Sequence, residues 1–223
     1  ENDKMLTLFS LQYGKISAAA KGVRKPGAKL RFAAQPFCFA EYVLAEKGER
    51  HTVVSASLTD GFYALREDIG KFYAAACVTG ISDAVLYGGI VNEELFLRAV
   101  SALGEMCRGN EAEALISFFL KALELSGYGL SFGACAGCGA PLAEGLRFDL
   151  SDGSFYCGKC ARGAGASLST LNVLRKCAGQ PYDAEAAGKD GVLRALRLLS
   201  AYFGEKTGAR VKALGEYIAL LGA

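Results

Sequence analysis

Two closely spaced pairs of cysteines constrain the fold of this 223-residue chain more than any other feature. Cys135 and Cys138 form one Cys-x-x-Cys pair and Cys157 and Cys160 form another, with residues 139–156 between them. This spacing is typical of a four-cysteine zinc site, in which each short turn directs two thiolates at one ion. Such a closed site leaves no position for a substrate, so the pattern predicts structural Zn²⁺ rather than metal catalysis. Two disulfides, or four unrelated core cysteines, are the alternatives.

The composition indicates a folded chain without a membrane partner. Hydrophobic residues make up 52% of the sequence, which is enough for one large core or for two to three small ones. No stretch approaches about eighteen uninterrupted apolar residues. The N-terminus, Glu1-Asn2-Asp3-Lys4, does not resemble a signal peptide and lacks an initiator methionine, so we expect a leading segment to be missing. Without export the thiols are in a reducing compartment, which favours a metal over disulfides.

The pattern of apolar residues changes along the chain. Up to residue 58 they alternate as in strands, in runs over residues 16–20, 38–44 and 54–58. Several short strands in about sixty residues predict a small barrel or sandwich. After Gly61 the period becomes helical, with three predicted helices before the cysteines and two after them. The other cysteines lie in apolar contexts and are expected to be small buried hydrophobes: Cys38, Cys77, Cys107 and Cys177.

These patterns predict an α+β chain in which a cysteine insert interrupts a helical bundle. We expect a β domain over residues 1–61 and the first part of a helical domain over residues 62–130. The insert is expected over residues 131–165, and the rest of the helical domain over residues 166–223.

The sequence offers little to a catalytic site. His51 is the only histidine, which excludes multi-histidine metal sites and the His-x-Glu motif of zinc deaminases. It lies in a strand-like run, where a structural residue is expected rather than a member of a catalytic triad. No phosphate-binding loop of the Gly-x₄-Gly-Lys-Ser/Thr type is present. We therefore expect no enzyme activity.

A second informative feature is a basic segment over residues 15–31, which contains no acidic residue. Its cations are Lys15, Lys21, Arg24, Lys25, Lys29 and Arg31. A flexible loop with several cations can follow nucleic-acid phosphates, so these residues are candidate DNA contacts. Aromatic residues nearby could stack on bases or belong to the barrel core: Phe9, Tyr13, Phe32, Phe37 and Phe39. The alternative for the basic segment is a solvated hairpin.

The order of these parts resembles that of the RecO family of bacterial recombination mediators. The family's N-terminal signature is matched by residues 6–10, 14–16 and 20–25, which read LTLFS, GKI and AKGVRK. Residues 35–37 (QPF) resemble the entry to the next strand. Further similar segments are residues 65–68 and 92–96, at two helix starts, and residues 125–128, before the cysteine insert. The family's first strand is not visible before Glu1, so we expect that strand to be missing from the barrel.

The resemblance implies a non-enzymatic protein with an N-terminal OB-fold and a structural zinc. Such proteins bind single- and double-stranded DNA and anneal complementary strands. They engage RecR and the C-terminal tail of single-stranded-DNA-binding protein, and they help to load RecA at gaps. A bacterial cytoplasmic, nucleoid-associated location follows. The tail is acidic and ends in an aromatic residue with a free carboxylate, so it needs an apolar pocket rimmed by cations. The candidate cations are Arg194, Arg197, Arg210 and Lys212.

Two other classes of function remain open at this point. One is a zinc-stabilised adaptor that binds only proteins, with an incidental basic loop. The other is an enzyme whose active site is not visible in the sequence, with the zinc insert as a scaffold. An acidic cleft or a cluster of strongly shifted ionisable groups would favour the enzyme.

Overall fold

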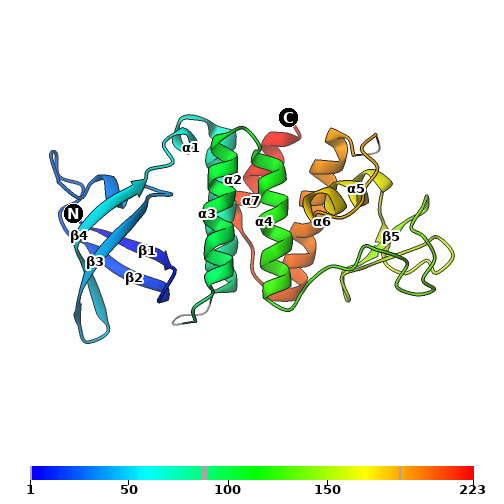
Figure 1. The fold of residues 1–223 in the computed structure, drawn as a ribbon, viewed down its shortest axis with the longest axis horizontal. Helices are drawn as coiled ribbons and strands as arrows, with labels where there is room; N and C mark the ends of the chain where they lie inside the picture. Colours follow the sequence, from blue (N-terminus) through cyan, green and yellow to red (C-terminus); the bar gives the residue numbers. More distant parts are fainter. Residues whose placement is uncertain (1, 87–89, 186) are drawn as a thin grey trace.

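Three parts follow one another along the long axis of the molecule (Figure 1). The computed structural model describes residues 2–86, 90–185 and 187–223. The N-terminal sheet lies at one end, the helices occupy the middle, and the cysteine insert lies at the other end. This arrangement confirms the predicted α+β class, and it places the basic segment and the four cysteines at opposite ends of the molecule.

The N-terminal sheet consists of two antiparallel hairpins joined side by side. Its strands are β1 (Lys4–Ser10), β2 (Gly14–Ala20), β3 (Phe39–Lys47) and β4 (Arg50–Asp60). They lie in the order β1-β2-β4-β3, and the short pairing between β2 and β4 is parallel. Ala18, Ala20 and Val53 form a small core between the strands, together with Val23 from the following loop. A 3₁₀ turn, η1 (Phe32–Ala34), precedes β3.

The β3–β4 ladder contains a register shift next to the buried apolar residue of β4. The shift lies between Val43 and Leu44 on β3. Val53 on β4 is 6% exposed, whereas the neighbouring Val54 is 58% exposed. The alternation over residues 54–58 therefore predicted the strand correctly, but its apolar residues do not mark the buried face.

The helices pack around one large apolar core. They are α1 (Ala64–Glu67), α2 (Ile69–Val85), α3 (Glu93–Cys107), α4 (Glu111–Leu125), α5 (Leu168–Cys177), α6 (Lys189–Thr207) and α7 (Lys212–Leu221). Two acidic or amide side chains fix helix starts, because Asp68 accepts from the Lys71 N–H and Asn92 accepts from the Leu95 N–H. Within the described ranges, no helix combines the length and the apolar character needed to cross a membrane.

Helix α5 was not expected, since only two helices were predicted after the cysteines. It is ten residues long and begins at a Ser167 cap, whose hydroxyl accepts from the Thr170 N–H. The polar side chains of Thr170 and Asn172 are buried among its apolar residues. Its sequence nevertheless shows a helical signal, since leucines recur every third residue from Leu168 to Leu174 behind the Ser167 cap, so this helix could have been predicted.

Aromatic rings join the sheet to the helices. Phe9 of β1 and Phe39 of β3 both pack on Phe96 of α3, with ring centroids 5.3 and 6.0 Å apart. Phe37 packs on Phe72 of α2 at 5.4 Å. These rings therefore belong to the interface between the two parts and not to the core of the sheet.

A guanidinium group secures the two chain segments that cross this interface. Arg66 donates hydrogen bonds to the carbonyl oxygens of Pro36 and Gly61, at 3.0 and 2.7 Å. Each carbonyl precedes a phenylalanine in the left-handed region, Phe37 with φ +64° and Phe62 with φ +42°. Such a conformation is unfavourable for a bulky residue, so the contacts around both phenylalanines must hold it in place.

Candidate metal centre and nucleic-acid interface

The four cysteines lie on two similar loops that face each other. In the first loop the Gly139 N–H donates to the Cys135 carbonyl, and in the second the Ala161 N–H donates to the Cys157 carbonyl, at 2.8 and 3.0 Å. Gly139 and Ala161 each follow the second cysteine of a pair, and both have positive φ angles, +70° and +49°. The local sequence thus closes two tight turns, which the short strands β5 (Arg147–Asp149), β6 (Ser154–Tyr156) and β7 (Ala164–Gly165) support.

The sulfur atoms converge as the spacing predicted. All four lie within 4.8 Å of one another, and the Sγ atoms of Cys138 and Cys157 are 3.7 Å apart. A tetrahedral site with metal–sulfur bonds of about 2.3 Å needs sulfurs about 3.8 Å apart, so a small contraction completes the geometry. The four cysteines are free thiols in the structure, which favours a metal site over the disulfide alternative.

Backbone amides and neighbouring sulfurs act on the thiols in opposite directions. Hydrogen bonds from backbone N–H groups, led by that of Cys157, lower the pKa of the Cys135 thiol to about 6. The N–H of Cys160 likewise lowers the pKa of Cys157. The crowded sulfurs, led by that of Cys138, raise the pKa of Cys160 to about 12. Four thiolates this close repel one another, and a cation at the centre removes that repulsion.

The insert is fixed to the helices by both apolar and polar contacts. Phe148 of the insert packs edge-on against Tyr202 of α6, with ring centroids 5.8 Å apart. Arg175 of α5 donates to the carbonyl oxygens of Phe132 and Gly133, at 3.0 and 2.9 Å. Lys206 of α6 also donates to the Ser151 carbonyl. These contacts fit a structural role for the site, since the insert is packed as part of the fold.

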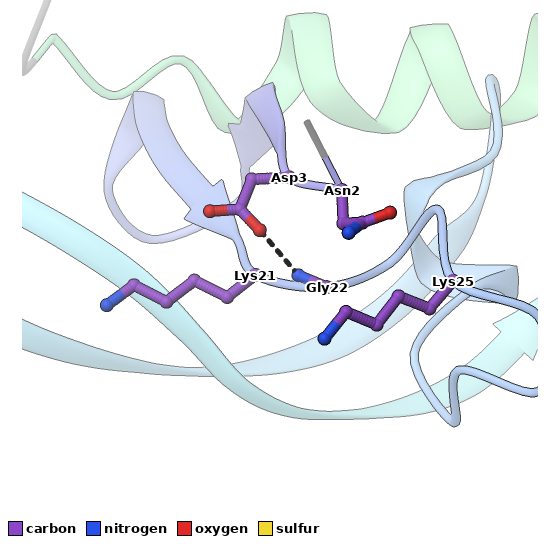
Figure 2. A pocket seen from close by; sticks show the side chains of 5 residues that line it. All are labelled: Asn2, Asp3, Lys21, Gly22 and Lys25. Carbon is purple, nitrogen blue, oxygen red and sulfur yellow. Dashed lines mark hydrogen bonds between the residues drawn. The ribbon is translucent and has the colours of Figure 1, made fainter.

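At the other end of the molecule, residues 21–31 of the basic segment form a loop, the basic loop. Hydrogen bonds within its backbone and to the N-terminal residues hold it in place. The Asp3 carboxylate accepts from the Gly22 N–H at 2.7 Å, and the Arg24 N–H donates to the Asn2 carbonyl at 3.0 Å. Figure 2 shows the side chains of Lys21 and Lys25 extending from this loop beside the Asp3–Gly22 hydrogen bond. The residues border a shallow hollow of about 470 Å³. No pattern in the sequence indicates that Asn2 and Asp3 hold this loop.

The six cations of the segment do not share one environment. Lys15 forms an ion pair with Asp83 of α2, with the Nζ and Oδ1 atoms 3.1 Å apart. The other five are exposed, and within the described residues none of them forms an ion pair. They are Lys21, Arg24, Lys25, Lys29 and Arg31. The buried side chain of Val23 anchors the loop while these cations face the solvent.

Comparison with known proteins agrees with this architecture. Residues 1–62 match the family model "Recombination protein O N terminal", and residues 66–215 match "Recombination protein O C terminal". The DNA repair protein RecO of Desulforamulus reducens is 36% identical over 78% of this chain and 70% of its own length. That of Pelotomaculum thermopropionicum is 34% identical over 81% and 72%, and that of Anaeromyxobacter dehalogenans is 31% identical over 100% and 93%.

The chain belongs to the RecO family. The resemblance seen in the sequence is therefore confirmed, and the N-terminal sheet is the OB-fold domain of a RecO protein. Family membership makes this a DNA repair protein in the broad sense.

Few aromatic rings of this RecO chain are available to stack on bases near the basic loop. Phe9, Phe37 and Phe39 are engaged with the helices, so they are not free to stack. Tyr13 is 66% exposed but lies beyond the other end of β2 from the loop, and Phe32 is half-buried in η1. Of the five rings considered, three are therefore engaged with the helices, and only Phe32 and Tyr13 are not.

The four cations predicted to bind a partner tail do not form one cluster. Arg197 lies beside the C-terminal end of α7, where a Cβ atom on Gly222 would be 3.7 Å from its guanidinium. Arg210 and Lys212 flank Val211 at the start of α7. The ten residues of α7 separate the two places by about 15 Å. Arg194 is engaged by Asp190, one turn earlier on α6, at 3.5 Å.

The groups with large pKa shifts outside the insert do not suggest catalysis. Within the described residues these are tyrosines and cysteines whose pKa values are raised mainly by burial, namely Tyr42, Cys77, Cys177 and Tyr217. Burial raises the pKa of Cys77 and of Cys177 to about 12, which keeps both thiols neutral at pH 7. Aspartate, glutamate, histidine and lysine, which usually supply a general acid–base pair, are not among these four groups.

Proposed function

We propose that this RecO chain is a non-catalytic, DNA-binding recombination mediator. It binds DNA through phosphate contacts from the loop that carries Lys21, Arg24, Lys25, Lys29 and Arg31. The observation that supports this proposal most directly is that these five cations are exposed and unpaired on an anchored loop of the OB-fold domain.

The same loop offers a physical basis for strand annealing. Cations that contact phosphates neutralise the repulsion between two strands, and they carry no sequence information. Because the nearby aromatic rings are engaged elsewhere, the bases of a bound strand remain free to pair with a complement. Annealing then needs no general acid, base or nucleophile. Binding to RecR and to the tail of single-stranded-DNA-binding protein, and assistance to RecA loading, are part of this proposal because they characterise the family that the chain resembles.

The proposed cofactor is structural zinc at Cys135, Cys138, Cys157 and Cys160. Four soft thiolates in a closed tetrahedral arrangement suit Zn²⁺, and no ligand position is left open for chemistry. Zinc would join the two loops and so stabilise the insert against the helices. Elemental analysis of freshly purified, reduced protein tests this directly, with about one zinc per chain expected.

DNA binding is tested by the dependence of affinity on salt. Five contacts to single-stranded phosphates predict a log–log slope of about −3.5, and replacing Lys21, Arg24 and Lys25 by alanine should flatten it by about two units. Exposed charges contribute little to stability, so this triple variant should fold normally. Unchanged slope and unchanged annealing in the folded variant would refute the assignment and favour an adaptor that binds only proteins.

A further inference from the structure

We infer that Cys138 is an oxidant-reactive thiol, and that peroxide converts Cys138 and Cys157 to a disulfide that releases the metal. The inference rests on the proposed zinc site. It concerns which two of the four sulfurs react first, and it follows from their exposure and spacing.

The sulfurs are covered unequally. Cys135 is 3% exposed and accepts a hydrogen bond from the Cys157 N–H at 3.2 Å, so a solvent-borne oxidant is kept from its sulfur. Cys157 is half-buried, whereas Cys138 and Cys160 are exposed. The attack of a thiolate on peroxide requires the sulfur to be reachable, so the first step falls to Cys138 or Cys160.

Contacts within the insert distinguish these two cysteines. The backbone of the first loop passes close to Cys160, because a Cβ atom on Gly137 would lie only 2.9 Å from the Cys160 sulfur. Cys138 is exposed and is flanked by Gly137 and Gly139, so neither of its sequence neighbours carries a side chain that could shield it. Its sulfur is also 3.7 Å from that of Cys157 on the opposite loop. Cys138 thus combines access for a small oxidant with a resolving thiol close by.

The reaction balances with hydrogen peroxide as the oxidant. The Cys138 thiolate attacks one peroxide oxygen, the O–O bond breaks, and a sulfenic acid and hydroxide form. The Cys157 thiolate then attacks the Cys138 sulfur and displaces the second oxygen as hydroxide. Two thiolates lose two electrons in total, and both peroxide oxygens are reduced to the level of water. A disulfide needs sulfurs about 2.05 Å apart, so the two loops must approach by less than 2 Å, which the glycines beside Cys138 permit.

The consequence is a metal site that opens without separating the two loops. The new disulfide joins the same loops that the metal joined, while only two thiolates remain as ligands. Two ligands hold zinc far more weakly than four, so the ion is released to a chelator. Phe148 and Phe155 stay packed under the loops, since neither belongs to the site.

Tryptic mapping of the whole protein reads out the pairing. Cleavage after Lys121, Arg147, Lys159 and Arg162 places Cys157 and Cys160 in separate peptides, while Cys135 and Cys138 share the peptide 122–147. Fragmentation of that peptide then assigns which of its two cysteines is bonded. Reduced protein with a measured zinc content is treated with hydrogen peroxide beside a chromogenic chelator, and remaining thiols are alkylated. The first disulfide is expected between the peptides of Cys138 and Cys157, and its appearance should follow zinc release one to one. A first disulfide between Cys157 and Cys160 would overturn the inference.

Two ligand-conserving variants supply the matched comparison. Cys138→His and Cys160→His each replace one exposed thiolate with an imidazole, which still binds zinc but is not oxidised to a disulfide. Both variants change a zinc ligand, so they are compared with each other: zinc release by peroxide should be about tenfold slower in Cys138→His than in Cys160→His, because only the former lacks the first reacting thiol. Equal rates in the two variants would contradict the assignment. Absence of zinc from the reduced wild-type protein would instead refute the metal site itself, so the two failures are distinguishable.

Discussion

The Lys15 ammonium lies 3.1 Å from the Asp83 carboxylate and joins strand β2 of the OB-fold domain to helix α2. Lys15 begins the basic segment in the sequence, yet its charge is already partnered, while the five cations that follow the end of β2 are not. The segment therefore divides into one cation that connects two parts of the fold and five that are available to phosphates.

This division predicts different behaviour for two lysines of the same segment. Lys25→Ala should flatten the salt dependence of single-stranded DNA binding by about 0.7 log units per log unit of salt, because one phosphate contact is lost. Lys15→Ala should leave the slope unchanged and alter the free energy of unfolding by about 0–1 kcal/mol, as is usual for a solvent-accessible ion pair. Fluorescence anisotropy across a salt series, with denaturant unfolding in parallel, measures both. Equal flattening in the two variants would show that Lys15 also contacts DNA.

The contact of Arg66 with the carbonyls of Pro36 and Gly61 predicts that this side chain stabilises the junction between sheet and helices. Arg66→Met keeps the aliphatic part of the side chain and removes both hydrogen bonds. Hydrogen bonds from a charged donor are worth about 1.5–3 kcal/mol each when buried, and Arg66 is only half-buried, so we expect a loss of about 1–3 kcal/mol in total.

Cleavage by a protease near residues 61–63 should also accelerate, because the strained backbone around Phe62 loses a contact that holds it. Arg98→Met is the matched control. Arg98 is exposed on α3, and its ion pair with Glu94 lies within one helix, so a change within about 0.5 kcal/mol is expected. If both variants lose the same small amount of stability, Arg66 does not secure the junction.

The parts of the fold that the sequence predicted depend on local patterns. The four cysteines were identified from their spacing, and each loop closes through hydrogen bonds within about five residues. The helix starts at Asp68 and Asn92 likewise depend on side chains three residues from the amide that they accept.

Apart from helix α5, the parts that were not predicted depend on contacts between residues far apart in the chain. Phe9 packs on Phe96, and Lys15 pairs with Asp83, across 68 positions. A sequence shows that these residues are aromatic or basic but not which distant element they meet. The same limit applies to the rings near the basic loop and to the four candidate partner-binding cations, because a sequence does not show which of them lie together.

The contacts of Tyr202 indicate that the stability of the insert depends on helix α6. Its side chain is 2% exposed and lies between Phe148 of the insert and the Lys206 ammonium, which is 5.4 Å from the ring centroid. Tyr202→Ala should cost about 3–5 kcal/mol of stability and should speed tryptic cleavage after Arg147 and Lys159, because the insert loses its main apolar contact. Tyr202→Phe retains the ring and should cost less than about 1.5 kcal/mol. Loss of stability without faster cleavage in the insert would indicate that other contacts hold it in place.

Gly139 and Ala161 occupy equivalent positions in the two cysteine loops. Both residues follow the second cysteine of a pair, and both adopt the left-handed conformation, with φ +70° and +49°. This conformation costs an alanine about 1–2 kcal/mol relative to glycine, whereas alanine in place of glycine gains about 0.4–1 kcal/mol by restricting the unfolded chain. The first effect is the larger, so Ala161→Gly should stabilise the insert and Gly139→Ala should destabilise it, each by about 0.5–1 kcal/mol.

No heavy atom lies within 4 Å of a Cβ atom placed on Gly139, so Gly139→Ala tests the backbone alone without a steric clash among the described residues. The measurement is zinc retention against a competing chelator at fixed pH, together with thermal unfolding of the zinc-loaded protein. The expected change of about 0.5–1 kcal/mol corresponds to a factor of about two to five in the chelator concentration that removes zinc. Ala161→Gly should retain zinc more strongly than the wild type, and Gly139→Ala less strongly. Shifts of the same sign in both variants would show that the unfolded chain, rather than strain at the second loop, dominates the stability of the site.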